Sequence, residues 1–462
     1  MKTYDIIIIG GGRASTLALK AANAGKSVAL IERDSLGGTC PNRGCVPSKL
    51  LIGYADVAKR IQEASRHHIS ATIEEINLAK IFEDLNQWIE DVDPRYESRF
   101  PDTLSLYRGE GKFLENKIIE VNGEKLTAET IVIGTGARPR PAAFPDLPTW
   151  TSDNLFPFKH TPPKSIAIVG GGFIACELAN FFHAVGIKVT LLVRSNTLLP
   201  NEDQTISSIF REQFSEFVPT KFETTITDAK HDGSKFNLTL NEGSTTSQIT
   251  VDALLYATGR IPNTDNLGTE NTDIVLDKRG FIKRGSNLET AVPGVYAVGD
   301  VAGTYQLQHA ASFETNHLVE QLINTKQKTS SEILTPMMPH AVFTDPEIAS
   351  VGITEQDLTK HGISTDEVVI VEEGWKSSAR VMSWRIDYPI TKLIIKKSDY
   401  SVIGCHMIGP ESSTMIHQIL MLIHLDNDIR NIPNMIHIHP GLSESLLAVA
   451  NKAISAIKGS IL

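Results

Sequence analysis

The feature that most constrains this chain is a short apolar strand that runs into a glycine turn, because it occurs twice. In the first copy, residues 3–9 form an apolar, β-branched run that ends at the turn 10–15, Gly-Gly-Gly-Arg-Ala-Ser. An apolar-periodic helix is expected over 17–24, and the next strand, 27–31, leads into Glu32. This order predicts a βαβ unit that binds a dinucleotide at the start of its helix.

Each position in this turn has a physical role in the prediction. Gly10 makes the tight turn, and Gly12 lets the backbone approach a pyrophosphate at the helix N-terminus. Glu32 is expected to bond both hydroxyls of a ribose. Ser15 stands where glycine or alanine is usual, and as a small residue it can satisfy the same packing requirement.

The second copy differs from the first at the acidic position. A strand over 165–169 leads into the turn 170–175, Gly-Gly-Gly-Phe-Ile-Ala, and the next strand covers 188–193. The residue that matches Glu32 is Val193, and Arg194 follows it. A missing carboxylate removes the repulsion of a 2′-phosphate, and a guanidinium attracts it. The second site is therefore predicted to bind NADPH, with NADH less favoured.

Two nucleotide sites in one chain favour a tightly bound flavin and a diffusing nicotinamide. The nicotinamide delivers two electrons as a hydride, and a flavin can pass them to a disulfide. Three further strand-and-glycine segments, 131–136, 254–260 and 294–300, fit two nucleotide-binding domains. The last of them ends on Asp300, which could bond a sugar-alcohol hydroxyl.

Two of the four cysteines, Cys40 and Cys45, lie in a glycine-rich stretch directly after the first nucleotide unit. Cys45 is expected at the start of a helix over 48–60, where the helix dipole lowers a thiol pKa. Lys49 adds positive charge one turn later. These features predict a redox-active pair. The remaining cysteines sit in apolar surroundings that favour the core: Cys176 and Cys405.

Composition excludes several classes of function. The net charge of −10 argues against a surface that follows nucleic-acid phosphates. The isoleucine run 6–9 is too short for a signal peptide or a membrane span. We therefore expect a cytoplasmic protein without membrane or nucleic-acid partners. No cysteine and histidine spacing is typical of a metal site, and none is expected.

A histidine near the C-terminus could supply the proton transfer that thiol–disulfide exchange requires. His439 precedes a proline, and Glu444 follows five residues later, where it could orient the second ring nitrogen. The pair is a candidate acid/base.

With these motifs in order, the chain resembles the class I pyridine nucleotide–disulfide oxidoreductases, which include glutathione reductase, lipoamide dehydrogenase and mercuric reductase. The resemblance covers the whole chain and is carried by Gly-Gly-Thr-Cys-x4-Cys-x-Pro-Ser-Lys at 37–49 and by His-Pro-x3-Glu at 439–444. Locally, the residues at 54–59, 342–348 and 438–440 are most similar to mycothione reductases.

The resemblance implies roles for the thiols and for the histidine. Cys45 would face the flavin as a thiolate, and Cys40 would attack the substrate disulfide. His439 would act from the partner subunit with support from Glu444, so a homodimer is implied. Small disulfides are the implied substrates.

The resemblance also implies two sets of cofactor contacts, in which Lys49 lies near the flavin and pairs with Glu177 beside the nicotinamide. The implied FAD residues are Gly10, Gly12, Arg13, Ala14, Ser15, Glu32, Gly38, Thr39, Cys45, Lys49, Gly111, Lys112, Thr135, Gly136, Gly299, Asp300, Leu307, Gln308, His309 and Ala310. The implied NAD(P)H residues are Gly170, Gly172, Phe173, Ile174, Glu177, Val193, Arg194, Thr258, Gly259 and Arg260.

The expected fold is α/β, with two Rossmann-like nucleotide-binding domains and a C-terminal α+β interface domain. We expect FAD binding in 1–149 and again in 264–334, NAD(P)H binding in 150–263, and dimerisation through 335–462. The leading hypothesis is an NADPH-dependent reductase of a small disulfide. One alternative is an NAD-linked dihydrolipoamide dehydrogenase of a multienzyme complex. Another is a flavoprotein redox sensor or binding subunit.

Overall fold

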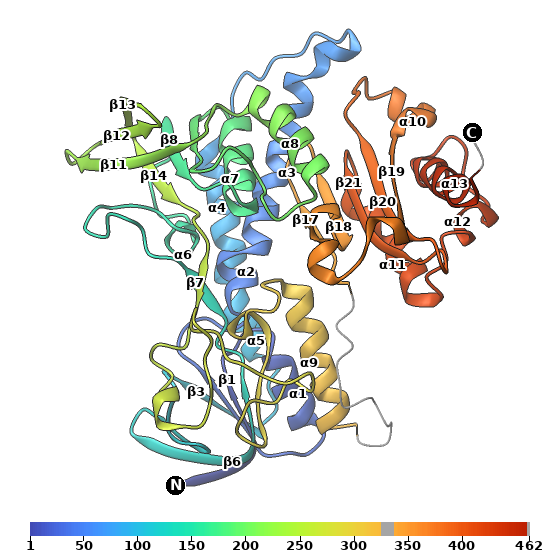
Figure 1. Cartoon of the computed structure of the whole chain (residues 1–462). Helices are drawn as coiled ribbons and strands as arrows, with labels where there is room; N and C mark the ends of the chain where they lie inside the picture. The colour runs from blue at the N-terminus through green and yellow to red at the C-terminus, as the bar shows by residue number, and fades with distance from the viewer. Residues whose placement is uncertain (325–336, 460–462) are drawn as a thin grey trace.

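The computed structural model describes residues 1–324 and 337–459, and its sheets form three parts that meet around a long helix (Figure 1). The expected boundary between residues 334 and 335 lies outside this range. Within it, no helix has both the length and the apolar character needed to cross a bilayer. The expected α/β class, with two nucleotide-binding folds and a C-terminal α+β part, is confirmed by these sheets.

The first part is a seven-stranded sheet with the order β3-β2-β1-β6-β5-β4, in which β16 pairs with the end of β6. Strands 1, 2, 3, 6 and 16 run parallel, and β4 and β5 extend the sheet antiparallel. The strands are β1 (Lys2–Ile9), β2 (Val28–Glu32), β3 (Leu104–Arg108), β4 (Lys112–Glu115), β5 (Ile118–Val121), β6 (Glu124–Ile133) and β16 (Val295–Ala297). Central strands buried on both faces explain the continuous isoleucine run, because helices and loops cover each side.

Helices before and after this sheet place the first glycine turn and the cysteines. α1 begins directly after the turn, and α9 packs beside α1 at the bottom of Figure 1. The helices that precede residue 100 are α1 (Ser15–Asn23), α2 (Thr39–Arg43), α3 (Cys45–Gln62), α4 (Leu78–Glu90) and α5 (Val92–Glu97); α9 (Gln308–Leu322) follows β16. α3 is longer than expected at both ends, and it starts at Cys45 itself.

The second part repeats the parallel plan with the sheet order β10-β9-β8-β14 and adds an antiparallel sheet, β11-β12-β13. Its elements are α6 (Ser152–Leu155), β8 (Ser165–Val169), α7 (Phe173–Ala184), β9 (Lys188–Leu192), α8 (Gln204–Phe217), β10 (Thr220–Lys221), β11 (Thr224–His231), β12 (Phe236–Glu242), β13 (Thr245–Val251) and β14 (Ala253–Tyr256). The antiparallel pair of β7 (Ala137–Pro139) and β15 (Arg260–Pro262) connects it with the first part.

The third part is an antiparallel sheet in the order β17-β18-β21-β20-β19, covered by helices at the right of Figure 1. Its elements are β17 (His340–Val342), β18 (Ile348–Gly352), β19 (Val368–Gly374), α10 (Ala379–Met382), β20 (Ile390–Lys396), β21 (Val402–Ile408), α11 (Ser412–Leu425), α12 (Asn431–Asn434) and α13 (Glu444–Lys458). Its own apolar core includes Cys405, which is fully buried as expected.

A buried set of charges joins the second and third parts. Lys392 on β20 and Asp203 before α8 are 1% and 0% exposed, and their side chains pair at 2.9 Å. Lys392 also contacts Glu355 at 2.5 Å. Burial raises the pKa of Asp203, but the hydrogen bonds from Lys392 and from the Glu355 backbone N–H, together with the nearby positive charges, leave that pKa below its usual value. Buried charges tolerate such a position only when they are paired.

We expect Lys392→Met to destabilise the protein, because it leaves the Asp203 carboxylate buried without its cation. Breaking a buried ion pair from one side costs about 3–5 kcal/mol. The denaturant midpoint should fall clearly for this variant. Lys376→Met is the matched control, since Lys376 pairs at 2.9 Å with the 88%-exposed side chain of Asp387. Equal midpoints for the two variants would contradict the assignment.

Candidate active site

The two cysteines lie at the junction of two helices. Cys40 is in the single turn α2, and α3 begins at Cys45 directly after Gly44. Both are free thiols in this structure. The interaction between the two thiols raises the pKa of Cys40 and lowers the pKa of Cys45 to about 7, and the Lys49 ammonium lowers the pKa of Cys45 further. Cys45 is thus the thiol that ionises first near neutral pH.

Lys49 and Glu177 form the ion pair that the resemblance implies. The Lys49 Nζ atom lies 2.8 and 2.7 Å from the two carboxylate oxygens of Glu177. Glu177 is only 3% exposed, and it also accepts a hydrogen bond of 3.0 Å from the Phe343 backbone N–H. Burial raises the pKa of Glu177, and the Lys49 charge opposes that shift. The contact joins α3, α7 and the segment after β17.

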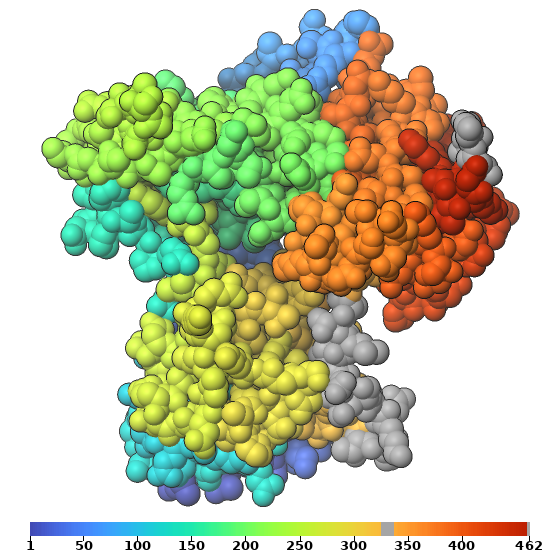
Figure 2. All heavy atoms as spheres, in the orientation of Figure 1, coloured from blue at the N-terminus to red at the C-terminus, as the bar shows by residue number. Residues whose placement is uncertain are grey.

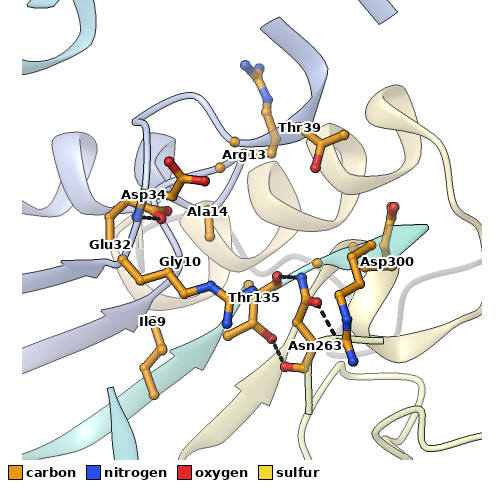
Figure 3. Close-up of a pocket in the computed structure, with 18 of the residues that line it drawn as sticks. Ile9, Gly10, Arg13, Ala14, Glu32, Asp34, Thr39, Thr135, Asn263 and Asp300 are labelled. Atoms are coloured by element: carbon orange, nitrogen blue, oxygen red, sulfur yellow. Dashed lines mark hydrogen bonds between the residues drawn. The ribbon is translucent and has the colours of Figure 1, made fainter. Parts of the chain in front are cut away.

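A cavity beside Cys40 is lined by the first glycine turn and by the segment 134–136 that follows β6 (Figure 3). Gly10 adopts φ +110°, and a Cβ atom there would collide with the carbonyl oxygen of Gly134. Only glycine fits this position. Glu32 ends β2 at the cavity wall, where its carboxylate accepts hydrogen bonds of 2.6 and 2.7 Å from the backbone N–H groups of Gly11 and Asp34.

The residues of this cavity fit a dinucleotide such as FAD. A Cβ atom on Gly12 would meet nothing closer than 3.8 Å, and one on Gly136 would meet nothing within 4 Å. The glycines therefore leave space for a bound group rather than for another part of the chain. The Nε atom of Arg13 is buried at the cavity without a hydrogen-bond partner among the described residues. A phosphate would satisfy this donor.

The structure brings most of the expected FAD residues together at this cavity. Those that line it are Gly10, Gly12, Arg13, Ala14, Glu32, Gly38, Thr39, Gly111, Thr135, Gly136, Gly299, Asp300 and Gln308. Those that do not are Ser15, Cys45, Lys49, Lys112, Leu307, His309 and Ala310. The Ser15 hydroxyl donates to the Gly12 carbonyl at 2.7 Å, and the His309 ring contacts the Pro339 carbonyl oxygen at 2.7 Å.

Sequence reasoning missed several polar residues of the cavity wall. Asn263 donates to the Thr135 carbonyl at 2.8 Å, and the Thr135 hydroxyl donates to the Asn263 carbonyl at 3.0 Å (Figure 3). Asp34 and Arg43 form an ion pair of 2.6 Å on the same wall. Asn263 follows β15, and its position just beyond the strand–glycine segment 254–260 was the available signal. No sequence signal indicated that Asp34 and Arg43 pair with each other.

The second glycine turn has the same geometry as the first. Gly170 adopts φ +141°, and a Cβ atom there would collide with the carbonyl oxygen of Ala257. Nothing lies within 4 Å of a Cβ atom on Gly172, which leaves room for a ligand backbone. Val193 is 1% exposed, while Arg194 is exposed and makes no ion pair within the described part of the chain.

The other residues expected around the nicotinamide differ in where the structure places them. The Phe173 ring at the start of α7 is 43% exposed, and Thr258 and Gly259 are exposed. Arg260 lies instead between the two nucleotide-binding parts, with its Nε atom 3.8 Å from an Asp300 oxygen and its guanidinium bonded to the Ala137 carbonyl. It therefore contacts a residue that was assigned to the other cofactor.

His439 and Glu444 meet as expected, but not beside the cysteines of the same chain. The His439 Nδ1 atom lies 2.7 Å from Glu444 Oε1, and the second oxygen accepts the Gly441 N–H at 2.9 Å. The His439 side chain is 78% exposed. It lies between α12 and α13 at the right edge of Figure 1, whereas α2 lies near the centre. A single described chain thus leaves the two groups apart.

Comparison with known proteins agrees with this site. Residues 4–315 match the model of the pyridine nucleotide-disulphide oxidoreductase family, and 338–450 match its dimerisation domain. Mycothione reductase of Mycobacterium tuberculosis is 32% identical, over 96% of this chain and 98% of that protein. Dihydrolipoyl dehydrogenase of Thermus scotoductus is 30% identical, over 97% of each. The HOCl-induced flavoprotein disulfide reductase RclA from Escherichia coli superposes with a TM-score of 0.83 at 26% identity, over 97% of this chain and 99% of that one.

We expect the reduced protein to be alkylated first at Cys45, with a pH midpoint near its pKa of about 7. Lys49→Met removes the nearby ammonium, so the pKa of Cys45 should rise and iodoacetamide labelling at pH 6 should slow by roughly threefold to tenfold. Peptide mass spectrometry measures the rate at each cysteine.

Two further variants control this experiment. Lys80→Met changes an exposed lysine on α4 and should leave the labelling rate unchanged. Lys49→Met combined with Glu177→Gln removes both charges, so it separates the electrostatic effect from damage by an unpaired carboxylate. Faster labelling of Cys40 than of Cys45 in the unchanged protein would refute the assignment.

Proposed function

This chain belongs to the pyridine nucleotide-disulphide oxidoreductases, and within that family we propose that it is an NADPH-dependent reductase of a small disulfide. The family makes it a flavoprotein enzyme that uses FAD and a redox-active disulfide. The observation that carries the proposal is the place of the two thiols at the junction of α2 and α3, where Cys40 lines the cofactor cavity and Cys45 begins the helix that carries Lys49. In the net reaction, one NADPH and one proton reduce one disulfide to two thiols.

FAD, when bound, supplies the step from a two-electron hydride donor to a sulfur pair. The chain contributes the binding surfaces and the thiols. We assign Gly10, Gly12 and Arg13 to the cofactor phosphates and Glu32 to its ribose. Lys49 keeps a positive charge beside Cys45 and so stabilises the thiolate, while Glu177 holds the Lys49 ammonium in place.

The dithiol form then performs two exchange steps. Cys40 transfers its proton to His439 and attacks one sulfur of the substrate, so a mixed disulfide forms and the first substrate thiolate leaves. The His439 imidazolium returns the proton to that thiolate. The Cys45 thiolate attacks the Cys40 sulfur, which closes the Cys40–Cys45 disulfide and releases the second thiolate. The proton of the net reaction, taken up from solvent by His439, protonates this second thiolate. Because Cys40 has the higher pKa, it needs this base.

We propose that His439 comes from the second subunit of a homodimer. In support, its side chain is 78% exposed and far from the cysteines of its own chain. The third part also exposes a group of large apolar side chains, which a partner would cover: Met421, Leu425, Met435, Ile436 and Ile438. Ile436 is 100% exposed, and large exposed apolar side chains in such number on one part of a protein are typical of an interface.

The choice of NADPH rests on the end of β9. Val193 stands where an acid would accept the ribose hydroxyls of NADH. The exposed Arg194 guanidinium, which makes no ion pair with any residue that the structure describes, could bind a 2′-phosphate. Because the chain is also similar to dihydrolipoyl dehydrogenase, an NAD-linked enzyme is the second candidate. Assays with NADPH and NADH distinguish the two candidates. We place the enzyme in the cytosol, where thiol pools keep such dithiols reduced.

We expect Cys40→Ser and Cys45→Ser each to lower disulfide turnover by at least about a hundredfold, because each removes one sulfur of the exchange. Initial rates with NADPH are measured on glutathione disulfide, mycothione and the disulfides of coenzyme A, bacillithiol and lipoamide. Cys176→Ala and Cys405→Ala change buried thiols and should keep turnover. Ferricyanide reduction, which bypasses the thiols, checks that all variants still receive electrons. Full disulfide turnover by either serine variant would refute the mechanism.

The cosubstrate assignment has its own test. Arg194→Ala should lower kcat/KM for NADPH by about tenfold and leave NADH unaffected, since a charge-assisted bond to phosphate contributes about 1.5–3 kcal/mol. Val193→Glu should move the preference toward NADH, because the new carboxylate repels the 2′-phosphate. A clear preference of the unchanged enzyme for NADH would instead favour the dihydrolipoamide dehydrogenase alternative.

A further inference from the structure

Arg43 lies inside the redox motif, between Cys40 and Cys45, and has no role in the function proposed above. It is the last residue of α2, and the backbone then passes through Gly44 into α3. Its side chain lines the cofactor cavity together with Cys40. Arg43 therefore belongs both to the cofactor cavity and to the loop that carries the two cysteines.

The guanidinium of Arg43 is fixed to the strand end that holds the ribose carboxylate. Its Nη2 atom lies 2.6 Å from an Asp34 carboxylate oxygen. The Asp34 backbone N–H donates to Glu32 at 2.7 Å, and the Asp34 carbonyl accepts from Arg108 at 3.2 Å. Arg43 therefore connects the cysteine loop with the segment after β2 through two consecutive contacts.

Two other observations concern the surroundings of Arg43 in the cavity. The Asn42 side-chain amide donates to the carbonyls of Leu36 and Gly38 at 2.9 and 2.8 Å, so the neighbour of Arg43 is anchored to the same segment. Asp153 in the first turn of α6 also lines the cavity. Burial raises the pKa of Asp153, and the charges of Arg260 and Arg43 oppose that rise. The charge of Arg43 thus acts on two carboxylates of the cavity, through the ion pair with Asp34 and through its effect on the pKa of Asp153.

We propose that Arg43 is a positioning residue that couples the redox state of the cysteine pair to the retention of FAD. The inference rests on the proposed role of Cys40 and Cys45. Closing or opening their disulfide changes the junction of α2 and α3, and Arg43 transmits that change to Asp34 and Glu32. By linkage, the factor by which reduction alters FAD affinity equals the factor by which FAD alters the disulfide equilibrium.

The size of the effect follows from exposure. The side chains of Arg43 and Asp34 are 32% and 48% exposed, so their pair is worth no more than a partly screened ion pair. We expect Arg43→Leu to change the disulfide equilibrium by about fivefold, which for a two-electron couple is about 20 mV. The same variant should bring the FAD dissociation constants of the oxidised and reduced enzymes closer together by a similar factor.

The experiment uses the holoenzyme. The Cys40–Cys45 equilibrium is read by alkylation and mass spectrometry in dithiothreitol redox buffers, and FAD dissociation constants are measured by flavin fluorescence in each state. Arg43→Lys should retain most of the coupling, because it keeps the charge. Asp34→Asn should reproduce the effect of Arg43→Leu, and the double variant should add little to either single change.

Arg33→Leu is the matched control. Arg33 lines the same cavity and pairs with Glu110 at 2.9 Å, but neither residue belongs to the cysteine loop. This change should leave the disulfide potential within a few millivolts of the unchanged enzyme's, even where FAD binds more weakly. Equal shifts in Arg33→Leu and Arg43→Leu, or no shift in Arg43→Leu, would overturn the proposal. A cysteine pair that never forms a disulfide in the titration would overturn the proposed function as well.

Discussion

A carboxylate that is 3% exposed needs a cation and hydrogen bonds in place of the water it has lost, and Glu177 obtains them from Lys49 and from the Phe343 backbone. The three groups come from α7, α3 and the segment after β17, so the contact holds three parts of the fold at one point. Because Lys49 lies one turn after Cys45 on the same helix, this contact also fixes the thiol beside a positive charge. The Cys40 thiol lowers the pKa of Cys45 most, and the Lys49 charge in this position lowers it further.

The two glycine turns have similar backbone conformations, but the strands that follow them end on different residues. Gly10 and Gly170 each adopt a positive φ and pass close to the carbonyl of the neighbouring strand. At the ends of the following strands the copies differ, since Glu32 is held by backbone N–H groups while Val193 is buried. The backbone conformation that the two turns share leaves room for a dinucleotide. In the proposed function, the residue at the strand end determines which dinucleotide binds.

Two of the ion pairs described above lie where parts of the chain meet. Lys392 and Asp203 join the second and third parts, and Arg43 and Asp34 join the cysteine loop to the first sheet. His439 differs from these residues, because Glu444 is its only ionic partner among the residues that the structure describes, and most of its side chain faces solvent. An acid/base held ready on an exposed surface is consistent with the proposed two-chain active site, in which a second subunit completes the environment.

The sequence alone determined the local features: both strand–glycine–helix units, the helix that starts near Cys45, the pairing of His439 with Glu444, and the family. These depend on period, glycine and charge within a short span, so neighbouring residues are sufficient to specify them. Tertiary structure alone decided that Lys112 and His309 lie off the cofactor cavity, that Arg260 faces Asp300, and that Arg43 reaches Asp34. Such contacts depend on how the sheets and loops pack, and a side chain's direction across a cavity wall is not encoded by its spacing along the chain.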